Sequence, residues 1–207
     1  LASGLKVASA LDDAAAFFAA RALTFRADDL NGLKDNIDQS ISTIQAAING
    51  IEAITSLIEQ AQGIAITAKA TSDTSERSSL AAQFDSLLQN IDDLANDSSY
   101  QGQNLIQGTP DNLVVDFNED STSQLTVAGI DSSTAATGLN VATASNDFVA
   151  DSDIDLALTA TRSALTTLRT SAAVLGSNNT VLQTRLNFTE DLVNTLEEGA
   201  GKLTLAD

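Results

Sequence analysis

The stretch that decides the fold is LNGLKDNIDQSISTIQAAINGIEAI, residues 30–54. Its large apolar residues recur at steps of three and four, at Leu30, Leu33, Ile37, Ile41, Ile44, Ile48, Ile51 and Ile54. The average step of about 3.4 residues is close to the heptad value of 3.5, which is typical of coiled-coil packing. The pattern predicts a helix from about Leu11 to about Thr71, and a helix of this length needs partner helices along it.

Three glycines interrupt this helical pattern, at Gly32, Gly50 and Gly63. Each costs about 1 kcal/mol relative to alanine inside a helix. The apolar stripe nevertheless keeps its phase across Gly50, so we expect one continuous helix, with a kink at Gly32 as the alternative.

Two further stripes of the same period predict a second helix that ends near Asn96 and a third from about Asp153 to Leu196. We expect Ser75 to cap the second helix, with Ser78 and Ser79 as alternatives. The second stripe consists of Leu80, Phe84, Leu87 or Leu88, Ile91 and Leu94. Because the connection between the first two helices is short, they should lie antiparallel.

The segment from Asp97 to about Ala150 differs from the rest, since it holds the only proline and many Ser, Thr, Asn and Asp residues. Alternating runs at 112–117 and 124–128 read as a hairpin that turns at 118–121, and 139–141 could add a third strand. The predicted fold class is mainly α with a small β-hairpin region, arranged as an elongated antiparallel helical bundle or rod. The expected organisation is a front long helix with a shorter antiparallel helix at 1–100, a hairpin insert packed on the rod at 101–150, and a back long helix at 151–207.

Composition excludes several classes of function. The 207 residues include no Cys and no His, so thiol nucleophiles, imidazole bases and Cys/His zinc sites are excluded. With 28 acidic and 10 basic residues, the net charge of -18 should repel nucleic acid and anionic lipid. No apolar run approaches the roughly 20 residues of a membrane span. The chain also contains no Met, which suggests a piece trimmed from a longer protein.

Clusters of carboxylates are the remaining candidates for chemistry. The run 151–155 opens like a calcium-binding loop, but Leu156 and Arg162 stand where that loop needs Gly and Glu. We interpret it as an acidic helix N-terminus. The adjacent pairs 12–13, 28–29 and 92–93 are interpreted as solvated helix surface, since neighbouring helical residues point about 100° apart. We therefore predict no enzyme activity, no metal site and no cofactor.

Three motifs resemble one family. The N-terminal run LASGLKVASALDDAA (1–15) is similar to a flagellin segment in which Ser-Gly-Leu precedes an Asp-Asp-Ala-Ala helix start. The run YQGQNLIQG (100–108) resembles an aromatic-Asn-Gly-x-x-Leu-Leu-x-Gly turn, with Gln101 where Asn is common, and RLNFT (185–189) matches the back helix. Together with the order of elements, these motifs identify the chain as similar to bacterial flagellin along its whole length.

The resemblance implies a structural subunit of the bacterial flagellar filament that self-assembles with other copies, serves swimming motility and is secreted through the flagellar export channel. It implies an export chaperone and cap and junction proteins as partners. The family's terminal polymerisation segments would lie outside this chain, so the resemblance implies that this piece does not polymerise alone. The alternatives are a hook–filament junction protein and a chemoreceptor-type coiled-coil signalling protein, although the latter would have no β insert.

The same resemblance implies a surface for the animal Toll-like receptor that senses flagellin. In recognised flagellins this surface carries Arg and Leu on the front helix and a Glu across the groove. The matching positions here are Gln60, Gln62, Ile64 and Asn90. Because the charged anchors are absent, we expect this receptor to sense the protein weakly.

Overall fold

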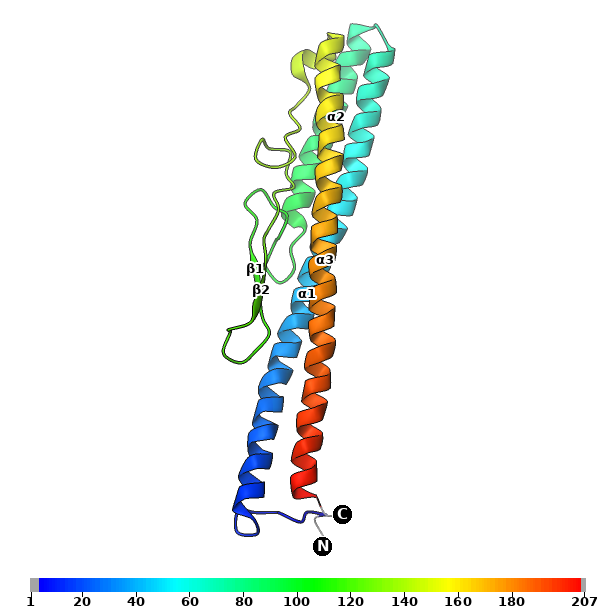
Figure 1. Cartoon of the computed structure of the whole chain (residues 1–207). Coiled ribbons are helices and arrows are strands. Elements are labelled where there is room, and N and C mark those ends of the chain that lie inside the picture. The colour runs from blue at the N-terminus through cyan, green and yellow to red at the C-terminus, as the bar shows by residue number, and fades with distance from the viewer. Residues whose placement is uncertain (1–3, 206–207) are drawn as a thin grey trace. The chain divides into compact units, whose positions relative to one another are not determined.

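The computed structural model describes residues 4–205, and Figure 1 shows their path. Its elements in chain order are α1 (Ala14–Ala70), α2 (Thr74–Asp97), β1 (Leu113–Asp116), β2 (Gln124–Val127), the single-turn helix η1 (Ser145–Phe148) and α3 (Asp151–Thr204). β1 and β2 form a two-stranded sheet. The predicted fold class, mainly α with a small β-hairpin region, is confirmed. The first three residues of the N-terminal motif lie outside the described residues.

The predicted cap of the second helix and the third strand are wrong, and α3 ends at Thr204, eight residues after the predicted Leu196. Asp73, not Ser75, caps α2, because its carboxylate accepts hydrogen bonds from the backbone nitrogens of Ser75 (2.8 Å) and Glu76 (3.1 Å). Residues 139–141 form no strand, although Leu139 and Val141 are buried. Their alternating apolar pattern reflects a loop that buries two side chains on the protein rather than a ladder of backbone hydrogen bonds.

The chain divides into two compact units, and α1 and α3 each contribute to both. Unit 1 comprises the residues up to Ile41, Val114–Leu125 and the residues from Thr180 onward. Unit 2 comprises Ser42–Leu113 and Thr126–Asn179. The division at 1–100, 101–150 and 151–207 stays a prediction.

In unit 1, α1 and α3 run antiparallel and share a small apolar core. The buried core residues are Ala27, Leu30, Val193 and Leu196, and Leu23, Leu33 and Leu192 pack against them. The chain ahead of α1 returns to the end of α3, where the backbone nitrogens of Lys6 and Val7 donate to the Thr204 carbonyl at 2.8 and 3.1 Å. Sequence-distant ends of the chain therefore lie side by side in this unit.

The hairpin tip is fastened to the helices of unit 1 by two contacts. Arg26 Nε donates to Glu119 Oε1 at 2.9 Å. The Arg185 guanidinium lies 4.8 Å from the centre of the Phe117 ring, within the range of a cation–π interaction. The pKa of Glu119 is lowered from its ordinary value of 4.5, first by a hydrogen bond from its own backbone nitrogen and then by Arg26.

Unit 2 has a core built from α1, α2 and α3. Its fully buried side chains on the helices include seven residues of the predicted stripes: Ile44, Ile51, Ile54, Phe84, Ile91, Ile154 and Leu168. Ile58 is also fully buried, although the first stripe was expected to continue through Leu57, which is half-buried. Phe148 of η1 enters this core and packs edge-to-face on Phe84, with ring centres 5.4 Å apart.

Gly50 explains how the loop after α2 reaches α1 in unit 2. A Cβ atom at this position would lie 2.4 Å from Ser98 Oγ and 2.6 Å from Ile106 Cδ1. By contrast, nothing lies within 4 Å of a Cβ placed on Gly32 or Gly63. A close contact with the loop after α2 therefore explains why glycine stands at position 50, although glycine destabilises a helix. No such contact explains the glycines at positions 32 and 63.

Within the part of the chain that the structure describes, one helix has the length and composition that a membrane span needs. α1 contains an 18-residue window with a mean hydropathy of 1.2, of which 39% is buried inside the protein. The sequence analysis found no membrane span because it looked for an unbroken apolar run of about 20 residues. The window in α1 instead reaches a high average hydropathy while containing polar residues. Long core helices of proteins outside membranes have the same property, so this observation alone does not assign a span.

Candidate functional site

A groove on unit 2 runs between α1 and α2 and has a volume of about 630 Å³. Seven residues line it: Gln60, Gly63, Ile64 and Thr67 on α1, and Gln83, Ser86 and Leu87 on α2. Their spacings of three, four and seven residues place each set on one helix face. The groove therefore follows directly from two amphipathic helices that present matching faces.

The structure brings two of the four predicted surface residues into this groove. Gln60 and Ile64 line it, and Asn90 lies one turn beyond Ser86 on α2, where its Nδ2 donates to the Ser86 carbonyl at 2.8 Å. Gln60 and Asn90 are exposed, and Ile64 is half-buried. Gln62 is half-buried on α1 but is not among the lining residues.

The sequence analysis did not assign the other lining residues to this surface, although it named Gly63 as a helix interruption and Leu87 as an alternative to Leu88 in the second apolar stripe. They are Gly63 and Thr67 on α1 and Gln83, Ser86 and Leu87 on α2. The signal that could have found them is their spacing of three, four or seven residues from Gln60, Ile64 and Asn90, because residues at these separations share a helix face.

The chemistry of the groove is that of a contact surface. Its lining consists of amides, hydroxyls, a glycine and aliphatic side chains, and none of the seven residues carries a charge near pH 7. A nucleophile paired with a base, or a set of metal ligands, would need titratable groups that this lining does not contain. Such a surface can bind a protein partner through shape, apolar contact and neutral hydrogen bonds.

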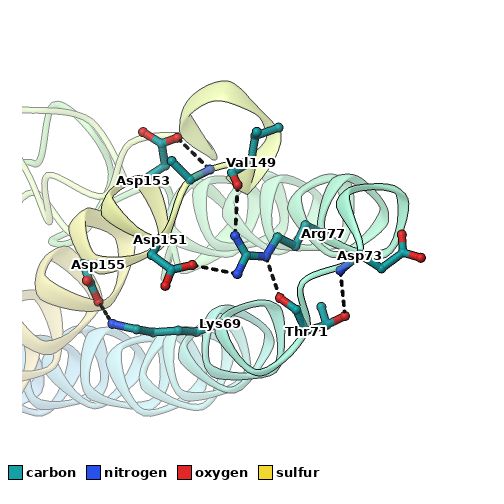
Figure 2. Close-up of polar contacts among 9 residues, drawn as sticks. Lys69, Thr71, Asp73, Arg77, Val149, Asp151, Asp153 and Asp155 are labelled. Carbon is teal, nitrogen blue, oxygen red and sulfur yellow. Dashed lines mark hydrogen bonds and ion pairs between the residues drawn. The ribbon is translucent and has the colours of Figure 1, made fainter.

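A second polar cluster lies at the turn between α1 and α2, and Figure 2 shows it. Arg77 is 8% exposed and makes three hydrogen bonds. Its Nε donates to the Thr71 carbonyl at 2.7 Å, one terminal nitrogen donates to the Val149 carbonyl at 2.9 Å, and the other to Asp151 Oδ1 at 2.7 Å. Arg77 thus fastens the start of α3 to the turn at Thr71.

The same cluster accounts for the carboxylates that resembled a calcium loop. Asp151 is paired with Arg77, Asp155 is paired with Lys69, and Asp153 accepts from the Ala150 nitrogen at 3.4 Å (Figure 2). Each carboxylate therefore has a partner within the protein. Within residues 4–205, no group of three potential metal ligands occurs.

Two of the three adjacent acidic pairs do more than cover a solvated helix surface. Asp92 accepts from the nitrogen (2.7 Å) and hydroxyl (2.9 Å) of Thr134 and so attaches the insert to α2. Asp12 accepts from the nitrogens of Ala8 and Ser9 and from the Ser9 hydroxyl, and Asp13 accepts from the Ala16 nitrogen at the start of α1. The hydrogen bonds to Asp12 lower its pKa, and the backbone nitrogen of Ser9 contributes most.

These observations agree with a comparison against known families. A sequence model of the bacterial flagellin N-terminal helical region matches residues 1–111, more than half of the chain. The chain belongs to the bacterial flagellin family. Flagellins are structural proteins of the flagellar filament rather than enzymes, and the family implies an extracellular filament as their location.

The fold of this flagellin is similar to that of solved structures. It matches the crystal structure of Bacillus cereus flagellin with a TM-score of 0.64 at 17% sequence identity, over 74% of this chain and 88% of that chain. At this identity the likeness supports the fold alone. A comparison with curated proteins finds no match.

Proposed function

We propose that this flagellin self-assembles with other copies of itself into the flagellar filament that drives swimming, after secretion through the flagellar export channel. The observation that carries the proposal is the family match over residues 1–111, which is supported by the flagellin-like arrangement of α1, α2, the hairpin and α3. An export chaperone and cap and junction proteins belong to the same proposal as partners. The chemoreceptor alternative has no β insert, whereas β1 and β2 are present in this chain.

The proposal is tested by deleting the gene and imaging the cells. Loss of filaments, with recovery when the wild-type gene is returned, supports a filament subunit. Antibody labelling of the complemented cells then separates the two filament roles: label along the whole filament supports the main subunit, whereas label only where filament meets hook would assign the junction role. Intact, unlabelled filaments in the deletion strain would contradict both.

We further propose that the animal Toll-like receptor for flagellin contacts the surface formed by Gln60, Gln62, Ile64 and Asn90, and senses it weakly. What supports this is that the groove beside these residues presents amides and hydroxyls rather than the charged anchors that often dominate interfaces.

A receptor-reporter assay checks this proposal. The wild-type protein should activate the receptor weakly. The double variant Gln60→Arg and Asn90→Glu should raise its potency at least about tenfold, since charge-assisted hydrogen bonds are among the stronger contacts at interfaces. Gln183→Arg, at an exposed position of α3, is the matched control and should leave potency unchanged. Full potency of the wild type would refute the weak-sensing proposal.

A further inference from the structure

Two arginines on the α3 segment of unit 2 have no acidic partner. Unit 2 contains four basic residues, and two of them, Lys69 and Arg77, are held in ion pairs. The other two, Arg162 and Arg169, are exposed and take part in no ion pair among residues 4–205. They are therefore the unpaired cations of a unit in which acidic residues far outnumber basic ones.

These two arginines lie on one face of α3. They are seven residues apart, which is nearly two full helical turns, so they leave the same face about 10.5 Å from each other. No acidic residue occurs from Leu156 to Thr189, so α3 itself does not neutralise them. We call Arg162 and Arg169 the arginine stripe.

The helix beside α3 places no acidic residue level with the arginine stripe. In unit 2, α1 and α3 run antiparallel (Figure 1), and the ion pair between Lys69 and Asp155 sets their register. Counting seven and fourteen residues from this pair places the first arginine level with Gln62 and the second level with Thr55. Both α1 residues are uncharged, so the arginine stripe stays unpaired within the chain.

A matching pair of acidic residues lies on the α1 segment of unit 2. Glu52 and Glu59 are also seven residues apart and exposed, and neither is in an ion pair among residues 4–205. The basic residues of unit 2 outside α3 are Lys69 and Arg77, and both are already paired, so neither neutralises these glutamates. We call Glu52 and Glu59 the glutamate stripe.

We propose that the arginine stripe of one copy docks on the glutamate stripe of a second copy of this chain. Each stripe spans about 10.5 Å, so both ion pairs form at once whichever way the two helices run relative to each other. α2 also exposes two unpaired acidic residues, Asp93 and Asp97, but these are four residues apart and do not match the arginine spacing.

The charge of the whole chain explains why this contact is specific to these positions. Copies with a net charge of -18 repel one another unless cations lie where they meet. The arginine stripe supplies such cations, and the glutamate stripe is a different surface, so each docked copy leaves a stripe free for a further copy. This inference rests on the proposed self-assembly and names residues through which it occurs.

Charge reversal followed by mixing tests the contact in assembly of filaments from purified monomers of the native protein. The arginine-reversed variant carries Arg162→Glu and Arg169→Glu, and the glutamate-reversed variant carries Glu52→Arg and Glu59→Arg. Each should need at least about tenfold more monomer to assemble, because like charges then face each other. An equimolar mixture should recover most of the loss, because each contact between the two variants again joins two arginines to two glutamates.

A control variant on α2 carries the same change in charge as the glutamate-reversed variant. It combines Asp93→Arg with Asp97→Arg, both at exposed positions. It should assemble like wild type, and it should not rescue the arginine-reversed variant on mixing. The urea unfolding midpoints of all variant monomers should equal that of wild type, because the stripes do not pair within one chain.

The outcomes separate this inference from the proposed function. Wild-type monomers that fail to assemble under any condition would refute self-assembly and the contact with it. Normal wild-type filaments, together with reversed variants that assemble equally well, would refute the contact alone. A mixture that assembles no better than its components would also refute the contact. So would a lowered urea midpoint of either reversed monomer that is restored when all four changes are combined in one chain, since the stripes would then pair internally.

Discussion

The glycines of α1 provide a test in which one substitution has opposite effects at matched positions. Replacing glycine by alanine inside a helix should stabilise the protein by about 1 kcal/mol wherever the added methyl group meets open space. Gly32 and Gly63 meet this condition, since nothing lies within 4 Å of a Cβ atom there. Gly50 does not, because its Cβ would lie 2.4 Å from Ser98 Oγ and 2.6 Å from Ile106 Cδ1.

The magnitudes follow from these contacts. Overpacking a well-packed core costs about 1–3 kcal/mol, so after the helical gain Gly50→Ala should be destabilising by up to about 2 kcal/mol. Ser98 gives way only at a cost, because its hydroxyl also donates to the Leu94 carbonyl at 2.6 Å. Gly50→Ala and Gly63→Ala, both in unit 2, should therefore differ by about 1–3 kcal/mol in opposite directions.

Urea unfolding followed by circular dichroism at a helical wavelength measures both variants against wild type. In a chain of this size, 1 kcal/mol also corresponds to about 2–4 °C in Tm. If Gly50→Ala raises the unfolding midpoint as much as Gly63→Ala does, the reasoning is refuted, because the loop after α2 then does not depend on close approach to α1.

Three further predictions concern single side chains. Arg77→Ala should lower the free energy of unfolding by about 2–4 kcal/mol, because it removes three hydrogen bonds made by a buried guanidinium. Lys69→Ala should lower it by less than about 1 kcal/mol, because the ion pair of Lys69 is exposed. Equal losses for the two variants in urea unfolding would contradict this prediction. Asp147→Gly should stabilise by about 0.5–1 kcal/mol, because Asp147 has a φ of 49°, and Asp147→Ala in the same assay should not. The pKa of Glu119 is lowered, so the stability that its carboxylate contributes is present above pH 4.5 and is lost as pH falls through the folded value. Protection of the hairpin amides from hydrogen exchange, measured relative to the intrinsic exchange rate at each pH, should therefore fall under acid in wild type and change less in Glu119→Gln.

Much of the helical architecture could be predicted from the sequence, because apolar residues at steps of three and four leave few alternatives to long paired helices. Residues such as Ile44 and Ile51 were assigned to the buried stripe on spacing alone, and both are fully buried. The hairpin was likewise visible in its alternating pattern. In the groove, Gln60 and Ile64 came from a family resemblance, whereas Gln83 and Leu87 required the pairing of α1 with α2.

Contacts between segments far apart in the chain were decided only by the tertiary structure. The spacing of residues along the chain does not reveal that Arg77 contacts Val149 and Asp151, because these partners are more than 70 residues away. It also does not reveal that Ser98 approaches Gly50, which lies on a different helix. The local sequence pattern also predicted Ser75 as the cap of α2, whereas Asp73 caps it in the structure. The amino-acid sequence determined which residues avoid water and with what period, a local property, whereas the folded chain determined which of the remaining polar, charged and small residues meet, since that depends on how distant segments are brought together in space.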